Sequence, residues 1–172
     1  VVLQPGDNVY KITVTIPQVK LWWTWDHGFP HLYTAALSAD GDQIEMNFGV
    51  KEITTDEAGQ WYLNGRHIFL RGMRYISSLW MSEANETMWE ADFRKMLDMD
   101  INAIRIGSHV ERDGLYTMCD EMGLLMWQVF PLHYCISDSD DVINRASDMI
   151  RDMGMMLTNH ACMGMWSVYK EP

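Results

Sequence analysis

The sequence predicts an α/β protein in which antiparallel strands are followed by alternating strands and helices. Up to about residue 60, apolar and polar side chains alternate with a period of two, as in half-buried antiparallel strands. After residue 70, short apolar runs alternate with stretches of helical periodicity, which indicates βαβ units and a parallel sheet. The 172 residues suffice for one core of ordinary size or for parts of two.

Three segments of the first half carry antiparallel signals. Residues 10–16, YKITVTI, alternate strictly and predict a half-buried strand. The turn sequence ADGDQ at 39–43 predicts a hairpin between HLYTAALSA and QIEMNFGVKEI. Asn64-Gly65 predicts a type I′ turn between two further short strands.

The second half is expected to contain four strands and three helices in alternation. Apolar runs place the strands at 67–73, 101–106, 124–130 and within GMWSVYKE, 164–171. Helix signals are a capping side chain at the start and a glycine after the last turn. The expected helices run from Asn85 or Thr87 to about Met99, over ERDGLYTMCDEM with Gly123 closing it, and from Asp140 or Asp141 to about Leu157.

Composition excludes several classes of function. The formal net charge of −11 argues against nonspecific nucleic-acid binding, because such binding needs a surface that neutralises phosphates. No stretch approaches the roughly 20 apolar residues that cross a bilayer, so no membrane span is expected. The first residues have neither the basic nor the apolar region of a signal peptide, and the compartment stays open.

Neither a disulfide framework nor a metal site is expected from the cysteines and histidines. Cys119, Cys135 and Cys162 show no CxxC spacing, so we interpret them as core or free thiols. The histidines show no ligand spacing with carboxylates on one helix, so no metal is predicted. No cofactor is expected either.

Four stretches of the sequence resemble motifs of one enzyme family, in the family's order. They are LWWTWDHGFPHLYTAAL, FGVKEI with YLNGRHIFLRGMRYI, INAIRIGSHVERDGLYTMCDEMGLLMWQVFPLHY, and NHACMGMWSVYKEP. The first resembles the last part of the immunoglobulin-like domain of glycoside hydrolase family 2, and the others resemble the first half of its catalytic (β/α)₈ barrel. The similarity is to the β-mannosidase-like branch and covers nearly the whole chain.

This resemblance implies a fold and a domain boundary. Residues 1–58 would be the C-terminal part of an immunoglobulin-like β-sandwich. Residues 59–172 would be the N-terminal half of a TIM barrel, comprising the first four βα units. The chain is therefore expected to be a fragment of a longer protein, cut inside the barrel.

The resemblance also implies the site residues. Catalytic groups of such barrels lie at the C-terminal ends of strands, and Glu171 stands where the family has its acid/base glutamate. The implied substrate-binding residues are Arg74, Arg105, His109, Trp127, Trp166 and Lys170. The implied partner is a carbohydrate, a β-linked glycoside.

One catalytic group of the family is expected to be missing. Retaining glycosidases need two carboxylates roughly 5 Å apart, a proton donor and a nucleophile. In the family the nucleophile comes from the seventh barrel strand, which this chain does not contain. The resemblance thus implies a retaining exo-β-glycosidase as the parent protein and a nearly inert isolated chain.

The sequence departs from the family pattern at three places around one pocket. Lys170 replaces the asparagine before the acid/base, Arg74 an asparagine of the first strand, and Val129 a carboxylate of the third. Lys170 beside Glu171 is expected to keep that glutamate ionised, the wrong state for a general acid. One hypothesis is a site adapted to an anionic sugar, with Arg74 and Lys170 meeting a carboxylate or sulfate; the other is decay of catalysis.

Alternatives to an enzyme fragment remain open at this point. A half-barrel exposes sheet edges and apolar interior, so the chain could be a noncatalytic carbohydrate-binding or self-assembling module, and a homo-oligomer covering those edges is possible. A rewired two-layer α+β fold is a third alternative. Trp22, Trp23 and Trp25 are expected to plug a domain junction, and His160 to act by hydrogen bonding as a structural residue.

Overall fold

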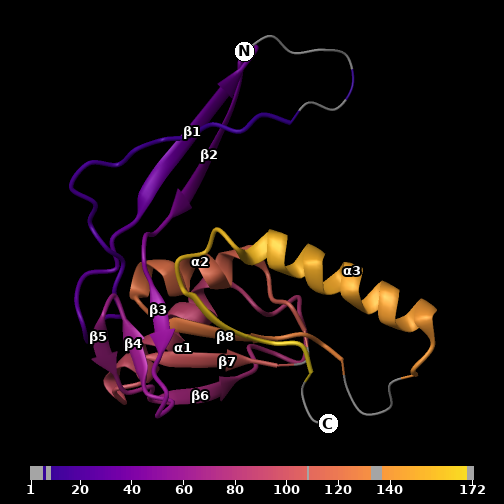
Figure 1. Ribbon diagram of the computed structural model, residues 1–172. Coiled ribbons are helices and arrows are strands. Elements are labelled where there is room, and N and C mark those ends of the chain that lie inside the picture. The colour runs from indigo at the N-terminus through magenta and orange to yellow at the C-terminus, as the bar shows by residue number, and fades with distance from the viewer. Residues whose placement is uncertain (1–5, 7–8, 108, 133–136, 170–172) are drawn as a thin grey trace.

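The structure is a computed structural model that describes residues 6, 9–107, 109–132 and 137–169. Among these residues it has two antiparallel sheets, one parallel sheet and three helices, which confirms the predicted α/β class (Figure 1). The antiparallel strands come first in the chain and the parallel strands follow, as the change of pattern near residue 60 predicts.

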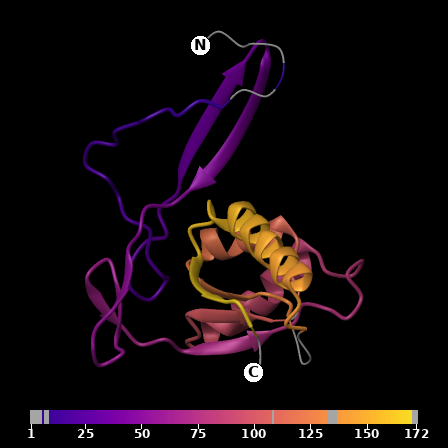
Figure 2. The same ribbon diagram turned by 45° about the vertical axis from the view of Figure 1, so that its right-hand side comes forward.

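The predicted hairpin at 33–48 is confirmed. Strands β1 (Tyr33–Ala39) and β2 (Asp42–Phe48) pair antiparallel from Tyr33↔Phe48 to Ala39↔Asp42. Asp40 and Gly41 both have positive φ, 48° and 91°, as a type I′ turn requires. The hairpin stands apart from the helices and the parallel sheet in both ribbon views, and most of its side chains are exposed (Figure 2).

The strand predicted at 10–16 is wrong. This segment has no regular secondary structure, and Ile12 and Val14 are largely exposed. Alternation produces a strand only where a neighbouring strand supplies hydrogen-bond partners. Among the described residues, strands β1 and β2 pair only with each other, and segment 10–16 pairs with neither of their free edges.

A three-stranded antiparallel sheet leads into the parallel sheet. It contains β3 (Ile53–Thr55), β4 (Trp61–Leu63) and β5 (Arg66–Ile68). Asn64 and Gly65 have φ of 51° and 77°, which confirms the type I′ turn.

The strand predicted at 67–73 is two strands in the structure. Its first residues belong to β5, which pairs with β4, and its last ones to β6 (Gly72–Tyr75), which pairs with β7. One apolar run thus serves two sheets, which periodicity within the run cannot show.

The strands of the parallel sheet lie side by side in the order in which they occur in the chain. Strand β6 pairs with β7 (Ala103–Ile106), then come β8 (Leu125–Val129) and β9 (Met163–Ser167). All three neighbouring pairs are parallel, as the βα rhythm predicts.

The three helices connect these strands within a residue or two of the predicted bounds. Helix α1 (Glu86–Asp98) starts at Asn85, whose side chain accepts a hydrogen bond from the Met88 amide. Helix α2 (Asp113–Met122) ends at Gly123 in the left-handed conformation. Helix α3 (Asp140–Leu157) is capped by Ser139 rather than by Asp140 or Asp141, and the Ser139 side chain makes no capping hydrogen bond.

The N-terminal tryptophans attach the first half of the chain to the α/β half. Trp22 is fully buried, and its indole N–H donates to the Asp120 carbonyl at 2.8 Å. The Trp25 indole N–H donates to the Ile101 carbonyl at 2.8 Å. A Cβ added at Gly123 would lie 2.6 Å from the Trp25 backbone nitrogen, so only glycine permits this approach. Trp22 and Trp25 thus lie where the first half of the chain contacts the α/β half, and the domain junction itself stays a prediction.

A buried polar network holds the start of β7 beside this junction. The fully buried Asn102 side chain accepts from the Arg71 amide at 2.8 Å and donates to Asp26 at 2.9 Å. Arg71 also forms an ion pair with Asp26, at 2.6 Å. Burial alone would raise the pKa of Asp26, but its polar contacts, first of all with His27, outweigh burial and lower the pKa from 3.8 to about 2.

The described cysteines are core residues. Cys119 and Cys162 are free and buried, and burial raises the pKa of both thiols. Cys135 lies outside the described residues. No helix in the described part of the chain is both long enough and apolar enough to cross a membrane.

Candidate functional site

Four side chains form a row across the parallel sheet, toward the C-terminal ends of its strands. The register aligns Arg74 on β6 with Arg105 on β7, Arg105 with Trp127 on β8, and Trp127 with Met165 on β9. The carboxyl ends of parallel strands share one edge of a sheet, where the ligands of α/β proteins usually bind.

This row points away from the helices. The adjacent residues face them instead: the Tyr75 and Phe93 rings lie 5.5 Å apart, and the Tyr116 hydroxyl donates to Gln128 at 2.7 Å. Because successive side chains of a strand point to opposite faces, Arg74, Arg105 and Trp127 occupy the face that none of the described helices covers.

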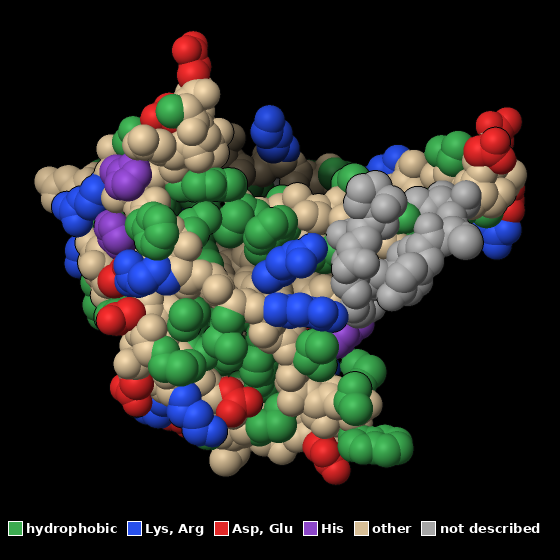
Figure 3. Space-filling view, turned by 90° about the horizontal axis from the view of Figure 1, so that it is seen from below, with side chains coloured by type: hydrophobic (Ala, Val, Ile, Leu, Met, Phe, Trp, Pro, Cys, Tyr) green, Lys and Arg blue, Asp and Glu red, His purple; other side chains and the backbone are tan. Residues whose placement is uncertain are grey.

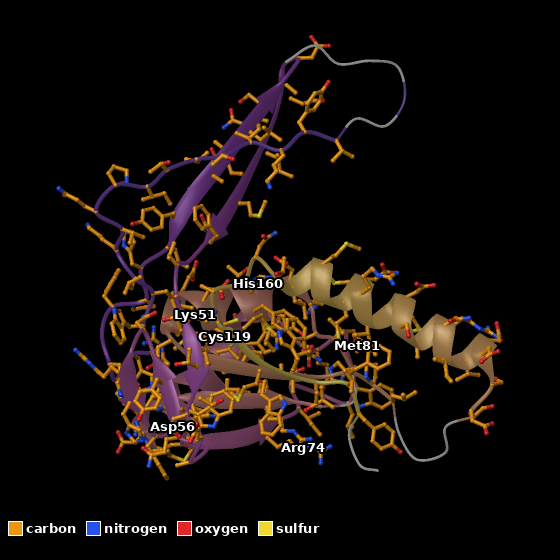
Figure 4. The ribbon with its side chains drawn as sticks, viewed as in Figure 1. Lys51, Asp56, Arg74, Met81, Cys119 and His160 are labelled. Atoms are coloured by element: carbon orange, nitrogen blue, oxygen red, sulfur yellow. The ribbon has the colours of Figure 1, made fainter. Side chains whose placement is uncertain are left out.

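A cavity of about 740 Å³ lies over this face. Figure 3 shows hydrophobic side chains gathered in a hollowed region with basic side chains beside it, and Figure 4 shows Arg74 on β6. The residues that line the cavity include Trp61, Arg74, Arg105, Trp127, Met165 and Trp166. Its size suits a small ligand such as a sugar unit.

Arg105 and Trp127 are in direct contact at the floor of the cavity. The Arg105 guanidinium carbon lies 4.8 Å from the centre of the Trp127 ring, which is a cation–π distance. The Trp127 indole N–H donates to the Ser167 hydroxyl at 2.8 Å, which fixes the ring. The Nε of Arg105 is buried and has no hydrogen-bond partner among the described residues.

His109 does not line this cavity, and its expected part in substrate binding stays a prediction. Its Nε2 lies 2.7 Å from the Glu111 carboxylate, which also accepts from the Ser77 hydroxyl at 2.5 Å. His109 lines a smaller cavity of about 290 Å³, together with Ile76 and Met81.

Glu111 is the buried centre of this contact, and sequence reasoning missed its role. Its amide donates to the Tyr116 hydroxyl at 3.1 Å, and Gln128 donates to the His109 carbonyl at 3.0 Å. These bonds tie the loop between β7 and α2 to strand β8. The available signal was a charged residue, in HVER, two positions before the first residue of helix α2.

The structure therefore brings together four of the predicted site residues: Arg74, Arg105, Trp127 and Trp166. Trp166 is 44% exposed at the edge strand β9. Lys170 and Glu171 lie outside the described residues, which end at Tyr169, two positions after the end of β9.

A second, acidic pocket adjoins α2. His160 Nδ1 lies 2.7 Å from Asp120 and its Nε2 lies 3.2 Å from Asp113, which confirms the predicted structural role of this histidine. Asp120 also accepts from the Cys162 amide at 2.6 Å. Within the described ranges, no three His, Cys, Asp or Glu side chains cluster so that they could hold a metal ion.

Comparison with known proteins places the chain among glycosidases, although no family model matches it. It is 31% identical over 189 residues to a mannosylglycoprotein endo-β-mannosidase of Lilium longiflorum, an alignment that covers 94% of this chain and 20% of that protein. The apo structure of Bacteroides uniformis β-glucuronidase 3 is 27% identical with a TM-score of 0.71, covering 87% of this chain and 20% of that one. The chain is related to the glycoside hydrolase family 2 enzymes.

Glycoside hydrolase family 2 relatives also share the fold of this chain. A β-D-mannosidase structure from Dictyoglomus thermophilum has a TM-score of 0.79 at 23% identity and covers 89% of this chain and 21% of that one. The chain spans about one fifth of the length of the relatives that it matches.

Proposed function

We propose that this chain is part of a retaining exo-β-glycosidase of glycoside hydrolase family 2. In this proposal residues 59–172 contribute the first four βα units of a catalytic (β/α)₈ barrel, and residues 1–58 the end of an immunoglobulin-like sandwich. Four parallel strands in chain order, each joined to the next through a helix, support the barrel assignment.

The observation that carries the proposal is the row of side chains under the large cavity. Arg74, Arg105 and Trp127 share one face of the sheet, near the strand ends. Strand β9 ends at Ser167, four positions before Glu171, so a catalytic carboxylate there would follow the same strand edge. Trp127 and Trp166 would stack against sugar rings, and Arg105 would bind oxygen atoms of the substrate.

In this proposal Glu171 is the acid/base. It would protonate the glycosidic oxygen as the bond to the anomeric carbon breaks, and it would later remove a proton from the attacking water. The nucleophilic carboxylate that forms the glycosyl-enzyme intermediate would have to come from sequence outside this chain. His109 would act only as a positioning residue for the loop between β7 and α2, through Glu111.

We expect the 172-residue chain alone to bind sugars without hydrolysing glycosides. Aryl β-mannoside, β-glucoside and β-glucuronide should give no turnover above the uncatalysed rate, with the natural chain and with Glu171→Gln alike. Hydrolysis that disappears in Glu171→Gln would contradict this expectation, since a second carboxylate would then be present.

Sugar binding tests the cavity separately, by calorimetry with the same three sugars. Trp127→Ala removes a ring from the cavity wall and should weaken binding about tenfold, given the roughly 1–3 kcal/mol that a buried aromatic side chain contributes. Trp80→Ala is the matched control, because Trp80 is 70% exposed and does not line this cavity. Equal losses in both variants would refute the assignment of the cavity as the sugar site.

The alternative of a noncatalytic binding or self-assembling module finds no support in the comparisons. The relatives named above are a mannosidase, a glucuronidase and a second mannosidase. Measurable sugar binding without any turnover is expected for both alternatives, and the relatives together with the row of side chains under the cavity favour the glycosidase fragment.

A further inference from the structure

Lys51 is a half-buried lysine that lies just before β3, against the tryptophans that join the two halves of the chain (Figure 4). Its Nζ lies 5.6 Å from the centre of the Trp22 ring, which is a cation–π distance. Trp22 is itself fully buried, and its indole N–H donates to the Asp120 carbonyl. The amine therefore lies against a fixed apolar ring and is only partly surrounded by water.

The backbone on both sides of Lys51 is held by hydrogen bonds. On one side the Val50 carbonyl accepts from the Trp22 amide at 2.8 Å. On the other side the Glu52 amide donates to the Asn64 side chain at 2.8 Å, and the Glu52 carbonyl accepts from the Asn64 amide at 2.8 Å. Because both neighbours are fixed, the lysine side chain starts from one defined position beside the ring.

The surroundings of Lys51 favour the neutral, nucleophilic form of its amine. Burial lowers the pKa of Lys51 below the ordinary 10.5, and the opposing effects of Cys162 and Asp120 do not outweigh burial. Lys20 and Lys95 are exposed, and Lys95 also forms an ion pair with Asp92 at 3.3 Å. Lys51 is thus the described lysine whose environment differs most from water.

We propose that Lys51 is a covalent modification site for aldehydes. Lysines that are desolvated beside apolar groups are the ones that form Schiff bases with carbonyl compounds. The neutral Nζ attacks the aldehyde carbon, its two protons pass to the carbonyl oxygen, and that oxygen leaves as water. One amine and one aldehyde thereby give one imine and one water, without an oxidant or an activated donor. This modification site is independent of the proposed function.

Reductive trapping on the 172-residue chain tests the proposal. The chain is incubated at about pH 7 with glyceraldehyde and cyanoborohydride, which reduces each imine to a stable secondary amine. Peptide mapping by mass spectrometry then gives the labelling rate at each lysine. Lys51 should be labelled several-fold faster than Lys20 and Lys95, and glycerol, which has no carbonyl group, should give no label. Equal rates at the three lysines, or a lower rate at Lys51, would overturn the proposal.

The pH dependence of labelling tests whether the environment of the amine is the cause. Competitive acetylation over a pH series should give a rate at Lys51 that rises with pH and reaches half its maximum below pH 10.5. A midpoint at or above that pH would contradict a neutral amine at this position.

Variants and unfolding assign the effect to the folded site. Lys51→Arg keeps a cation over Trp22, so the fold is expected to persist, and the fast label should disappear. Lys20→Arg is the matched control, because it replaces an exposed lysine, and it should leave the fast label unchanged. In concentrated urea the preference for Lys51 should vanish. A preference that persists there would overturn the proposal, because the local sequence would then cause it.

Discussion

His160 shows how single residues join the two halves of the α/β region. Its ring contacts Asp113 and Asp120 of α2 from the turn that precedes β9. Asp120 in turn receives hydrogen bonds from the Cys162 amide and, at its carbonyl, from the Trp22 indole. One histidine–aspartate pair therefore connects α2, β9 and the N-terminal tryptophans.

The pH dependence of stability should report this contact. Burial lowers the pKa of His160, but the hydrogen bonds and charges of Asp120 and Asp113 outweigh it and raise the pKa above 6.5. A raised folded-state pKa gives stability that is fully present below pH 6.5 and is lost as the pH rises through the folded value. Urea unfolding should thus show a lower free energy of unfolding at about pH 8 than at about pH 5.5.

Replacement of His160 tests how much of the pH dependence of the free energy of unfolding comes from this residue. His160→Gln should flatten the curve between those two pH values, whereas His67→Gln, at an exposed position on β5, should leave its shape unchanged. An unaltered curve in His160→Gln would mean that other groups cause the dependence.

At the scale of elements, helix α1 and helix α3 differ at their N-termini. The Asn85 side-chain oxygen accepts a hydrogen bond from the Met88 backbone N–H at 3.1 Å. The Ser139 side chain makes no such hydrogen bond at the start of α3. Asn85→Ala should therefore lower the free energy of unfolding by about 1 kcal/mol. Ser139→Ala should change it by much less, so the pair forms its own control in urea unfolding. Equal effects would show that capping does not account for the start of α1.

The antiparallel elements show that alternation of apolar and polar residues does not by itself predict a strand. The hairpin β1–β2 forms because Asp40-Gly41 determines its turn and its two strands pair with each other. Segment 10–16 has as clear an alternation but pairs with no strand of the described chain, and it forms no strand. Pattern and turn chemistry together predict a strand better than pattern alone.

At the scale of the whole molecule, the parallel sheet presents two open edges in the described part of the chain. Among the described strands, β6 pairs only with β7 and β9 only with β8. Unpaired backbone N–H and C=O groups of an edge strand can pair with another chain. The hairpin adds exposed apolar side chains, including Leu37 and Ile44.

We therefore expect the isolated chain to associate. Sedimentation velocity across a concentration series should show a mass that rises above 20.0 kDa as the concentration increases through the micromolar range. A compact monomer throughout that range would contradict this expectation and would mean that the edges are protected within one chain.

Local signals account for what the sequence predicted correctly. Asn64-Gly65, the Asn85 cap and the Gly123 terminus each depend on the conformation of a few adjacent residues, so each can be inferred from the chain alone. The parallel order of β7, β8 and β9 likewise follows from apolar runs separated by helices.

The site required more than local signals. The resemblance indicated Arg74, Arg105, Trp127 and Trp166 individually, but not that they line one cavity. His109 lines a different cavity and contacts the buried Glu111, so its part in substrate binding stays a prediction. The roles of Lys170 and Glu171 remain proposals, because both lie outside the described residues.

The sequence by itself determined the turns, the helix ends and the succession of strands and helices, because these depend on backbone preferences and side chains close together in the chain. Only the tertiary structure decided that residues 67–73 serve two sheets and that Arg74 and Arg105 stand side by side without a described counter-charge. The physical reason is strand register: it aligns residues about 30 positions apart, and a shift by one residue would turn every side chain to the opposite face.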